Sequence, residues 1–182
     1  MYPALVFTSL MCVLFQFDPI QAWVVWDHNA IADGQWWRIV TGNFSHTNLS
    51  HLAMNLIGLW VISYLFQPNK KQLISALLFI SVVTGLALLL SSIQVYMGLS
   101  GTLHGLFGLF ALREALNGRQ SSWLLVVGLI AKIAWEQFVG PSSTTGELIN
   151  ARVAIEAHLA GALAGGFISI ASFLTSRKTD QS

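Results

Sequence analysis

The stretch of sequence that decides the fold is Ser100–Arg113, which reads SGTLHGLFGLFALR. The 13 residues before Arg113 carry no formal charge, but at ~1.5 Å per residue they cover only ~20 Å of a hydrocarbon core about 30 Å thick. If Arg113 lies at one membrane face, Ser100 begins its helix roughly 10 Å beneath the other face. We then expect Ser91–Leu99 to descend into the protein as non-helical chain. Because irregular backbone at that depth needs protein or water around it, the stretch predicts a short, recessed helix that opens on a water-filled outward cavity.

The composition of the whole chain indicates a membrane protein. Of 182 residues, 54% are hydrophobic and 9% are charged, whereas a soluble domain carries roughly 25% charged residues. Charged residues leave uncharged runs of 31, 41 and 20 residues, which have the length of membrane spans. The net charge of +1 gives no electrostatic reason to expect nucleic acid as a partner. The single Cys12 cannot form an internal disulfide.

We expect an all-α polytopic membrane protein that forms one domain over residues 1–182. The expected spans lie at about residues 3–17, 51–66, 73–90, 100–112, 123–138 and 154–174. A signal peptide is the alternative for the first span. Met1–Phe17 has no basic segment, however, and Phe15–Asp18 makes a poor cleavage site, so we treat this segment as a span.

The distribution of basic residues predicts the orientation of the spans. Six basic residues are expected on one side: Lys70, Lys71, Arg113, Arg119, Arg177 and Lys178. The opposite side has Arg38 and Arg152. Both termini should therefore be cytoplasmic, and the loop Asp18–Ser50 should face outward. The four tryptophans of this loop, Trp23, Trp26, Trp36 and Trp37, suit the membrane interface.

Three of the spans bring polar residues to the same side of the membrane, because all three run from outside to inside. These residues are His51, Asn55, Ser100, His104 and His158. Ionisable side chains within a membrane are costly and are by default candidates for a functional site. Any one of these residues alone could merely hydrogen-bond a neighbouring helix. Their convergence favours a site.

The chemistry open to this set is restricted. A serine nucleophile needs a neighbouring base and donors for the oxyanion, so Ser100 would be the nucleophile and His158 the base. Ser100 at a helix N-terminus also lies near free backbone N–H groups. Asn55 follows His51 by one helical turn and could donate further hydrogen bonds from the same face. The histidines, with His46, match no metal-ligand spacing, and we expect neither metal nor cofactor.

Glycines predict how the serine and the histidine meet. Gly101, Gly105 and Gly108 give the fourth span a small face, and Gly161 and Gly165 give the sixth span another. Small faces let two helix backbones approach closely. Because His158 precedes Gly161 by three residues, its imidazole lies on about the same face. Close packing of these spans should bring it near Ser100.

Two features near the outer end of the fifth span allow alternative interpretations. Lys132 and Glu136 are spaced i, i+4, which is typical of a plain ion pair within a helix. Alternatively, Glu136 contacts the substrate or an attacking amine. The loop Val139–Arg152, with its glycines and proline, could be a flexible lid over the cavity or a surface loop without a role.

The motifs together resemble those of the rhomboid intramembrane serine proteases, over Trp37 to about Gly166. The motifs are Gln35-Trp36-Trp37-Arg38, the spaced set His46, His51 and Asn55, Gly98-Leu99-Ser100-Gly101, and Ala157-His158-Leu159-Ala160-Gly161. The resemblance implies a six-helix bundle and a serine endopeptidase with a Ser100–His158 dyad that lacks a third carboxylate. It also implies an oxyanion site from His51, Asn55 and the Ser100 backbone N–H. Substrates would come from the bilayer and be cut near the outward end of a transmembrane segment.

Within the family, the sequence looks most like the rhombosortase branch. His104 stands where many bacterial rhomboids carry a tyrosine that stacks on the histidine, and Trp135-Glu136-Gln137 and Ala157–Gly165 add to the likeness. This branch implies exported substrates with a C-terminal tail of a Gly-Gly motif, a hydrophobic helix and a basic cluster. It also implies a bacterial inner membrane with the site open to the periplasm. Trp135, Glu136 and His46 are candidates for substrate contact or gating. A general bacterial rhomboid protease is the alternative.

Two other functional classes compete with a protease. A small transporter could use the polar cluster as a pathway, but transporters usually show internal repeats and intramembrane carboxylates. A repeat is not visible, and the three spans from residue 51 to 112 contain neither Asp nor Glu. An inactive protein of this fold could bind helices without cutting them. The presence of both Ser100 and His158 argues against that function.

Overall fold

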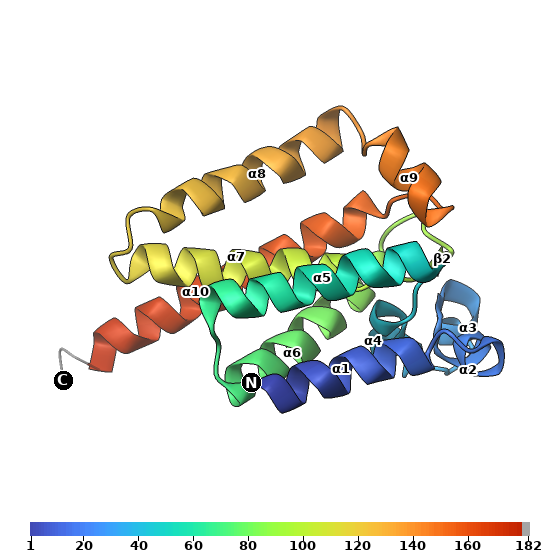
Figure 1. Ribbon diagram of the computed structural model, residues 1–182. Helices are drawn as coiled ribbons and strands as arrows, with labels where there is room; N and C mark the ends of the chain where they lie inside the picture. The colour runs from blue at the N-terminus through green and yellow to red at the C-terminus, as the bar shows by residue number, and fades with distance from the viewer. Residues whose placement is uncertain (180–182) are drawn as a thin grey trace.

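The computed structural model describes residues 1–179 and is mainly helical (Figure 1). The long helices are α1 (Tyr2–Leu14), α5 (Leu49–Phe66), α6 (Lys70–Leu88), α7 (Ser100–Leu116), α8 (Ser122–Phe138) and α10 (Ile155–Thr179). The short elements are α2 (Asp18–Val24), β1 (Trp26–Asp27), α3 (His28–Ala32), α4 (Arg38–Thr41), the 3₁₀ helix η1 (Gly42–Phe44), β2 (Val95–Tyr96) and α9 (Ser143–Ile149). Each of the six expected spans thus corresponds to one long helix.

The long helices make the chain a multi-pass membrane protein. Among the described residues, three segments are long and apolar enough to cross a membrane: Leu49–Phe66, Lys70–Leu88 and Ile155–Arg177. Two bent pairs, α1 with α2 and α8 with α9, raise this number to five if each pair is a single span.

Helix α7 is longer than expected. It continues past Arg113 to Leu116, so the expected end at Leu112 is wrong. Arg113 lies in the last turn, where a positive charge is favourable beside the free carbonyl groups of the helix. Glu114 is paired with Arg119 beyond the helix end at 3.0 Å. The helix therefore continues through Arg113 and Glu114.

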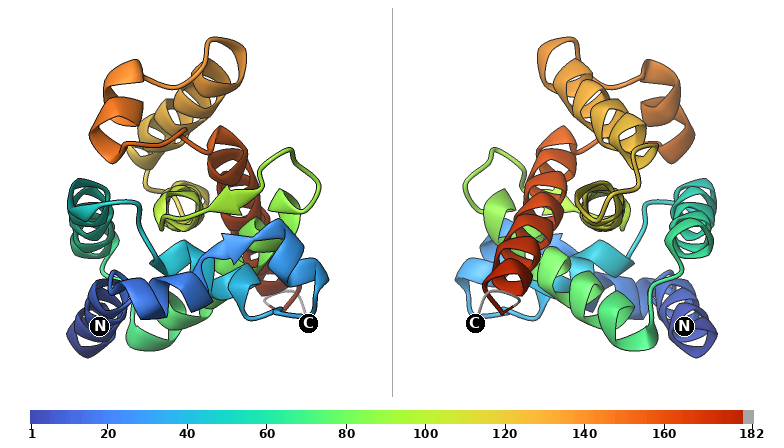
Figure 2. Two further views of the ribbon diagram at one scale, coloured as in Figure 1. Left: turned by 90° about the vertical axis from the view of Figure 1, so that its right-hand side faces the viewer. Right: turned by 90° about the vertical axis from the view of Figure 1, so that its left-hand side faces the viewer.

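Helix α7 is the central element of the bundle. The end-on views in Figure 2 show α5, α6, α8 and α10 arranged around it, and all four contact it. Leu106 and Ala111 of α7 have no exposed surface. Because its neighbours surround it, the first residue of α7, Ser100, lies between helices and not on the outer surface of the bundle.

Glycines form the seam between α7 and α10, as their spacing predicts. A Cβ atom added to Gly161 would overlap the carbonyl oxygen of Gly101, and one added to Gly165 would overlap that of Gly105. A Cβ on Gly101 would lie 2.8 Å from the carbonyl oxygen of Ala157. The two backbones are therefore in direct contact, and no larger residue fits this seam without moving the helices apart.

A buried polar cluster fixes the first turn of α7 on the side that faces α6 and η1. Thr102 donates a hydrogen bond to the Asn43 amide oxygen at 3.1 Å, and its hydroxyl lies 3.0 Å from that of Ser81 on α6. The Asn43 amide nitrogen in turn donates to the Ser81 carbonyl oxygen at 3.2 Å. Because these three side chains are buried and satisfy one another, they hold the start of α7 at a fixed place.

The segment between α1 and α5 folds into short elements that pack on this end of the bundle. Strand β1 pairs antiparallel with β2. Trp26 is fully buried, and its indole N–H donates to the Gly85 carbonyl oxygen at 3.0 Å. The interfacial position expected for Trp26 is therefore wrong, while Trp23, Trp36 and Trp37 are exposed. The indole is buried because its one polar atom finds a backbone acceptor on α6.

The two segments that flank the site are both ordered. Ser91–Leu99 is non-helical, as expected, and contains β2. The segment Val139–Arg152 is not the flexible loop that its composition suggests, because it contains helix α9. The hydroxyl of Thr47 donates to the Ile149 carbonyl oxygen at 2.6 Å, and Asn48 donates to Leu148 at 3.1 Å. These bonds attach α9 to the start of α5.

Candidate active site

The structure brings Ser100 and His158 together. Ser100 is the first residue of α7, and His158 lies on the first turn of α10. The Ser100 Oγ lies 2.9 Å from the His158 Nε2. This is the distance of a hydrogen bond in which the hydroxyl donates to the imidazole. The glycine seam produces this contact, because only closely packed helices bring two such short side chains within reach.

The other ring nitrogen of His158 has a carboxylate partner. The His158 Nδ1 lies 2.9 Å from Oε2 of Glu136 on α8, and the Glu136 Oε1 accepts a hydrogen bond from the Lys132 Nζ at 2.6 Å. The family resemblance implies a dyad that lacks a third carboxylate, whereas the structure places a carboxylate within hydrogen-bond distance of the histidine. Lys132 and Glu136 do form an i, i+4 ion pair, but the second carboxylate oxygen of Glu136 also contacts the imidazole. Glu156, the other acidic residue near this end, is instead paired with Arg152.

The ring of His104 covers one face of the His158 ring. Their centroids are 4.1 Å apart and their planes differ by 20°, so the rings are stacked. The His104 Nδ1 donates a hydrogen bond to the Ser100 carbonyl oxygen at 2.7 Å, which fixes its ring. One helical turn of α7 thus holds Ser100 and His104, and the first turn of α10 holds His158 against both.

Glycine is required at position 98, just before the serine. Gly98 has φ of +133°, a backbone conformation that side chains disfavour. A Cβ there would also lie 2.7 Å from the His51 Cε1 and 3.7 Å from the Asn55 Nδ2. The chain that leads into Ser100 therefore lies directly against both residues that the sequence singles out as oxyanion donors.

Asn55 and His51, the two side chains beside Gly98, differ in whether they have a free hydrogen-bond donor. The Asn55 Nδ2 is buried and finds no hydrogen-bond partner within residues 1–179, so it is free to donate to a ligand. The His51 Nδ1 lies 3.0 Å from the Thr47 Oγ1. Because that hydroxyl already donates to Ile149, it accepts from the imidazole. A neutral His51 therefore carries its proton on Nδ1, and its Nε2 is an acceptor.

A tyrosine that sequence reasoning missed supports the same turn. The Tyr96 hydroxyl donates to the Gly98 carbonyl oxygen at 2.5 Å, and the side chain is buried. Burial raises the pKa of Tyr96 above its ordinary value, so the hydroxyl remains protonated and can donate. In the sequence, the one indication of this role is that Tyr96 lies two residues before Gly98. That indication is too weak to identify the tyrosine as part of the site.

His46 lies behind the site and not in it. Its ring packs edge-on against that of His51 at 5.1 Å, and it is fully buried. Burial, followed by the neighbouring His51, lowers the pKa of His46 to about 3, so this histidine is neutral at physiological pH. Contact between His46 and a substrate would require a rearrangement, whereas the indole of Trp135 is exposed at the edge of the site.

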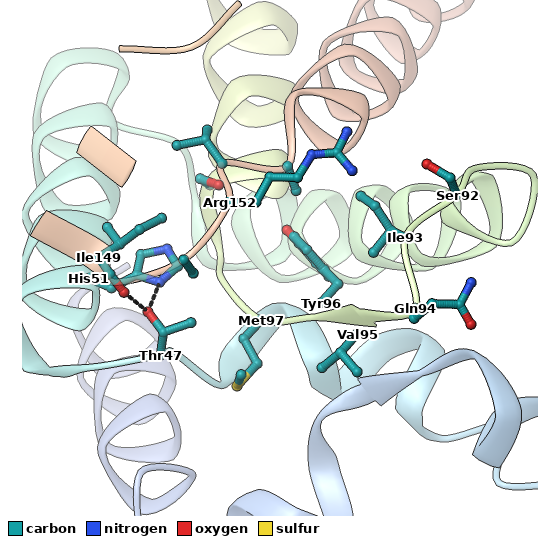
Figure 3. A pocket seen from close by; sticks show the side chains of 14 residues that line it. Thr47, His51, Ser92, Ile93, Gln94, Val95, Tyr96, Met97, Ile149 and Arg152 are labelled. Carbon is teal, nitrogen blue, oxygen red and sulfur yellow. Dashed lines mark hydrogen bonds between the residues drawn. The ribbon is translucent and has the colours of Figure 1, made fainter. Parts of the chain in front are cut away.

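Cavities open on both sides of Ser100. One, the outer cavity, has a volume of about 350 Å³ and is lined by the 92–97 segment and residues 151–154 (Figure 3). The other, the inner cavity, has a volume of about 530 Å³ and lies among α5, α7, α8, α9 and α10. Ser100 and His51 line both. An extended peptide could therefore pass from one cavity to the other across the serine hydroxyl.

An apolar groove continues the inner cavity along the bundle. It has a volume of about 390 Å³ and lies between Ile62 of α5, the middle of α7 and residues 124–132 of α8. His104 and Lys132 line both the groove and the inner cavity. In Figure 1, α8 lies close to α7 at its N-terminal end and diverges from it toward α9.

The geometry of the histidines does not favour a metal ion. Ligand atoms of His104, Glu136 and His158 lie within 4.8 Å of one another, close enough for a metal site by distance alone. However, both nitrogens of His158 are already hydrogen-bonded. The nitrogen lone pairs of stacked rings lie in nearly parallel planes, so those of His104 and His158 do not converge on one point.

A serine hydroxyl hydrogen-bonded to an imidazole, at the start of a buried helix among membrane-length helices, is the arrangement expected of a membrane-embedded serine hydrolase. The comparison with known families agrees: the Rhomboid domain matches residues 33–175. The chain therefore belongs to the rhomboid family, and it is an intramembrane serine protease.

Two curated relatives show how far the similarity extends. The Bacillus subtilis (strain 168) protein named "Putative rhomboid protease YdcA" is 28% identical over 203 residues, which cover 100% of this chain and 92% of the relative. "Rhomboid protease GlpG" of Salmonella choleraesuis (strain SC-B67) is 27% identical over 170 residues, covering 87% of this chain and 56% of the relative. The chain thus spans about half the length of GlpG.

Proposed function

We propose that this protein is a rhombosortase, an intramembrane endopeptidase that removes C-terminal sorting tails from exported proteins. The observation that carries the protease mechanism is the 2.9 Å contact between the Ser100 hydroxyl and the His158 imidazole. The Gly-Gly specificity rests on the resemblance of His104, Trp135-Glu136-Gln137 and Ala157–Gly165 to that branch.

The proposed reaction has two stages. The Ser100 Oγ attacks the scissile carbonyl carbon while the His158 Nε2 accepts the hydroxyl proton. The tetrahedral oxyanion accepts hydrogen bonds from the Asn55 amide and the Ser100 backbone N–H. The C–N bond then breaks as His158 returns the proton to the leaving amine, and the ester on Ser100 is hydrolysed by water.

The substrate would approach from the lipid through the gap between α5 and α8. The apolar groove suits a hydrophobic helix, and the inner cavity suits the unwound segment that precedes it. Trp135 is 63% exposed at this edge, which suits a contact with the incoming helix. In this arrangement Lys132 is near the point where the helix would unwind.

The proposed setting is a bacterial inner membrane that six helices cross. In this setting both termini are cytoplasmic, α7 is recessed, and the outer cavity opens to the periplasm. The asymmetry of Lys and Arg supports this orientation. The bent pairs α1–α2 and α8–α9 would each contribute one crossing, and α7, with 17 residues, would be the sixth.

The test is cleavage of two matched substrates by the purified protein in detergent or vesicles. One substrate carries a Gly-Gly motif, a hydrophobic helix and a basic cluster; in its control, both glycines are leucine. We expect cleavage of the first, little cleavage of the second, and none by Ser100→Ala. Efficient cleavage of the control substrate would leave a general rhomboid protease and remove the rhombosortase assignment.

A further inference from the structure

Glu136 is a buried carboxylate whose two oxygens serve different partners. Its side chain is 9% exposed, whereas that of Lys132 is 49% exposed. A plain ion pair on a helix surface would leave both groups outward. Here the carboxylate turns inward, and Oε2 reaches the His158 Nδ1 at 2.9 Å. Burying a carboxylate is costly unless it is paired and hydrogen-bonded, so this inward contact requires an explanation.

The contact with Glu136 selects the form of His158 that a base requires. A carboxylate only accepts hydrogen bonds, so the His158 Nδ1 must carry a proton. The neutral ring then has its lone pair on Nε2, which faces the Ser100 hydroxyl. When Nε2 takes the serine proton, the ring becomes an imidazolium beside a negative charge. The same carboxylate therefore orients the base and stabilises its charged form.

On this basis we propose that Glu136 is a positioning residue that acts through His158, so that the site is a Ser100–His158–Glu136 triad. This inference rests on the proposed serine protease mechanism and adds a third member to it. Lys132 holds the other carboxylate oxygen at 2.6 Å and thereby fixes the rotamer of Glu136. The stacked His104 supports the ring of His158 from one face, and Glu136 supports it at its edge.

Helix α8 thus has two roles in the proposal. It borders the groove where the substrate helix would lie, and it supplies the group that orients the base. The contact of α8 with α10 is therefore part of the active arrangement of the site.

The decisive variant is Glu136→Gln, which keeps the size of the side chain and removes its charge. Glu147→Gln, at an exposed position of α9, is the matched control. We expect Glu136→Gln to lower kcat by about 10²- to 10⁴-fold with KM unchanged, while Glu147→Gln retains the parent kcat. Lys132→Met keeps the carboxylate on His158 and should lose less activity than Glu136→Gln.

A second readout needs no substrate. A fluorophosphonate probe reacts directly with an activated serine, and it has no amine or helix for Glu136 to contact. Labelling of Ser100 should slow in Glu136→Gln as kcat does. In folded Ser100→Ala protein, proton NMR should also show a strongly deshielded imidazole proton between Nδ1 and the carboxylate, and the additional change Glu136→Gln should remove it.

The outcomes separate this inference from the proposed function. If the parent protein labels on Ser100 and Glu136→Gln labels at the same rate, the triad is wrong and the serine mechanism stands. If Glu136→Gln raises KM alone, Glu136 is a substrate contact. If the parent does not label on Ser100 at all, the proposed function itself fails.

Discussion

At the scale of single residues, His158 is held from three directions. Ser100 lies at one ring nitrogen, Glu136 at the other, and His104 stacks on one face. These contacts confine the imidazole to one orientation, which is the one that the proposed proton transfer requires. Pre-orientation of this kind places reacting groups within hydrogen-bond distance before the substrate arrives.

The unpaired amide of Asn55 leads to the first prediction. Asn55→Ala should lower kcat by about 10²- to 10³-fold with little change in KM, because it removes a donor aimed at developing charge. His51→Ala should cost less in kcat, since the Nε2 of a neutral His51 is an acceptor. Steady-state kinetics of both variants on the Gly-Gly substrate measure the difference. Equal losses, or a change in KM alone for Asn55→Ala, would show that the donor assignment is wrong.

The sequence predicts much of the site at this scale, but not all of it. Ser100 and His158 could be paired because glycines fix the separation of their helices. Glu136 could not be assigned to His158, since the rotation of its helix depends on packing that no periodic pattern encodes. The sequence predicts an interfacial position for Trp26, which is wrong. An indole suits a membrane interface and a buried hydrogen-bond acceptor equally well, and only the fold shows that the Gly85 carbonyl oxygen is that acceptor.

At the scale of helices, the seam between α7 and α10 sets the distance between Ser100 and His158, the proposed nucleophile and base. Gly101, directly after Ser100, and Gly161, one turn after His158, allow the two backbones to touch. By contrast, α8 contacts α7 and α10 less extensively, and its Glu136 lies against His158 at the wall of the inner cavity. The bundle therefore combines a tight seam, which holds Ser100 and His158 together, with a more loosely packed helix that borders the groove.

The seam gives the second prediction. Gly161→Leu should abolish activity and lower thermal stability in detergent, because its side chain would overlap the Gly101 backbone and separate Ser100 from His158. Gly166→Leu on the same helix is the control, since nothing lies within 4 Å of an added Cβ there. The measurements are the cleavage activity and the thermal unfolding temperature of both variants, each compared with the parent protein. Parent-like activity in Gly161→Leu would contradict the tight seam.

Helix α9 illustrates where sequence reasoning at the element scale fails. Its serines, threonines and glycine are typical of a loop, and the sequence predicts a flexible loop over Val139–Arg152. The structure forms a helix there because Thr47 and Asn48 bind its last carbonyl groups and Ile149 is buried. Such long-range contacts are invisible to local propensity.

At the scale of the whole molecule, the third prediction concerns orientation. With Cys12 replaced by Ala, a cysteine at Ser142 should react with a membrane-impermeant maleimide added to spheroplasts, and a cysteine at Ser121 should react only after lysis. The reason is that these positions lie at opposite ends of α8, and the basic residues place the Ser121 end in the cytoplasm. The reverse pattern would invert the proposed topology.

The central claim is that Ser100 is the nucleophile and His158 its base, and covalent labelling tests it most directly. The purified protein in detergent is treated with a fluorophosphonate probe, and the adduct is located by peptide mass spectrometry. We predict one adduct on Ser100 in the parent, none in Ser100→Ala, and labelling slowed by more than about 10³-fold in His158→Ala. An adduct on another residue, or labelling of His158→Ala at the parent rate, would contradict the account.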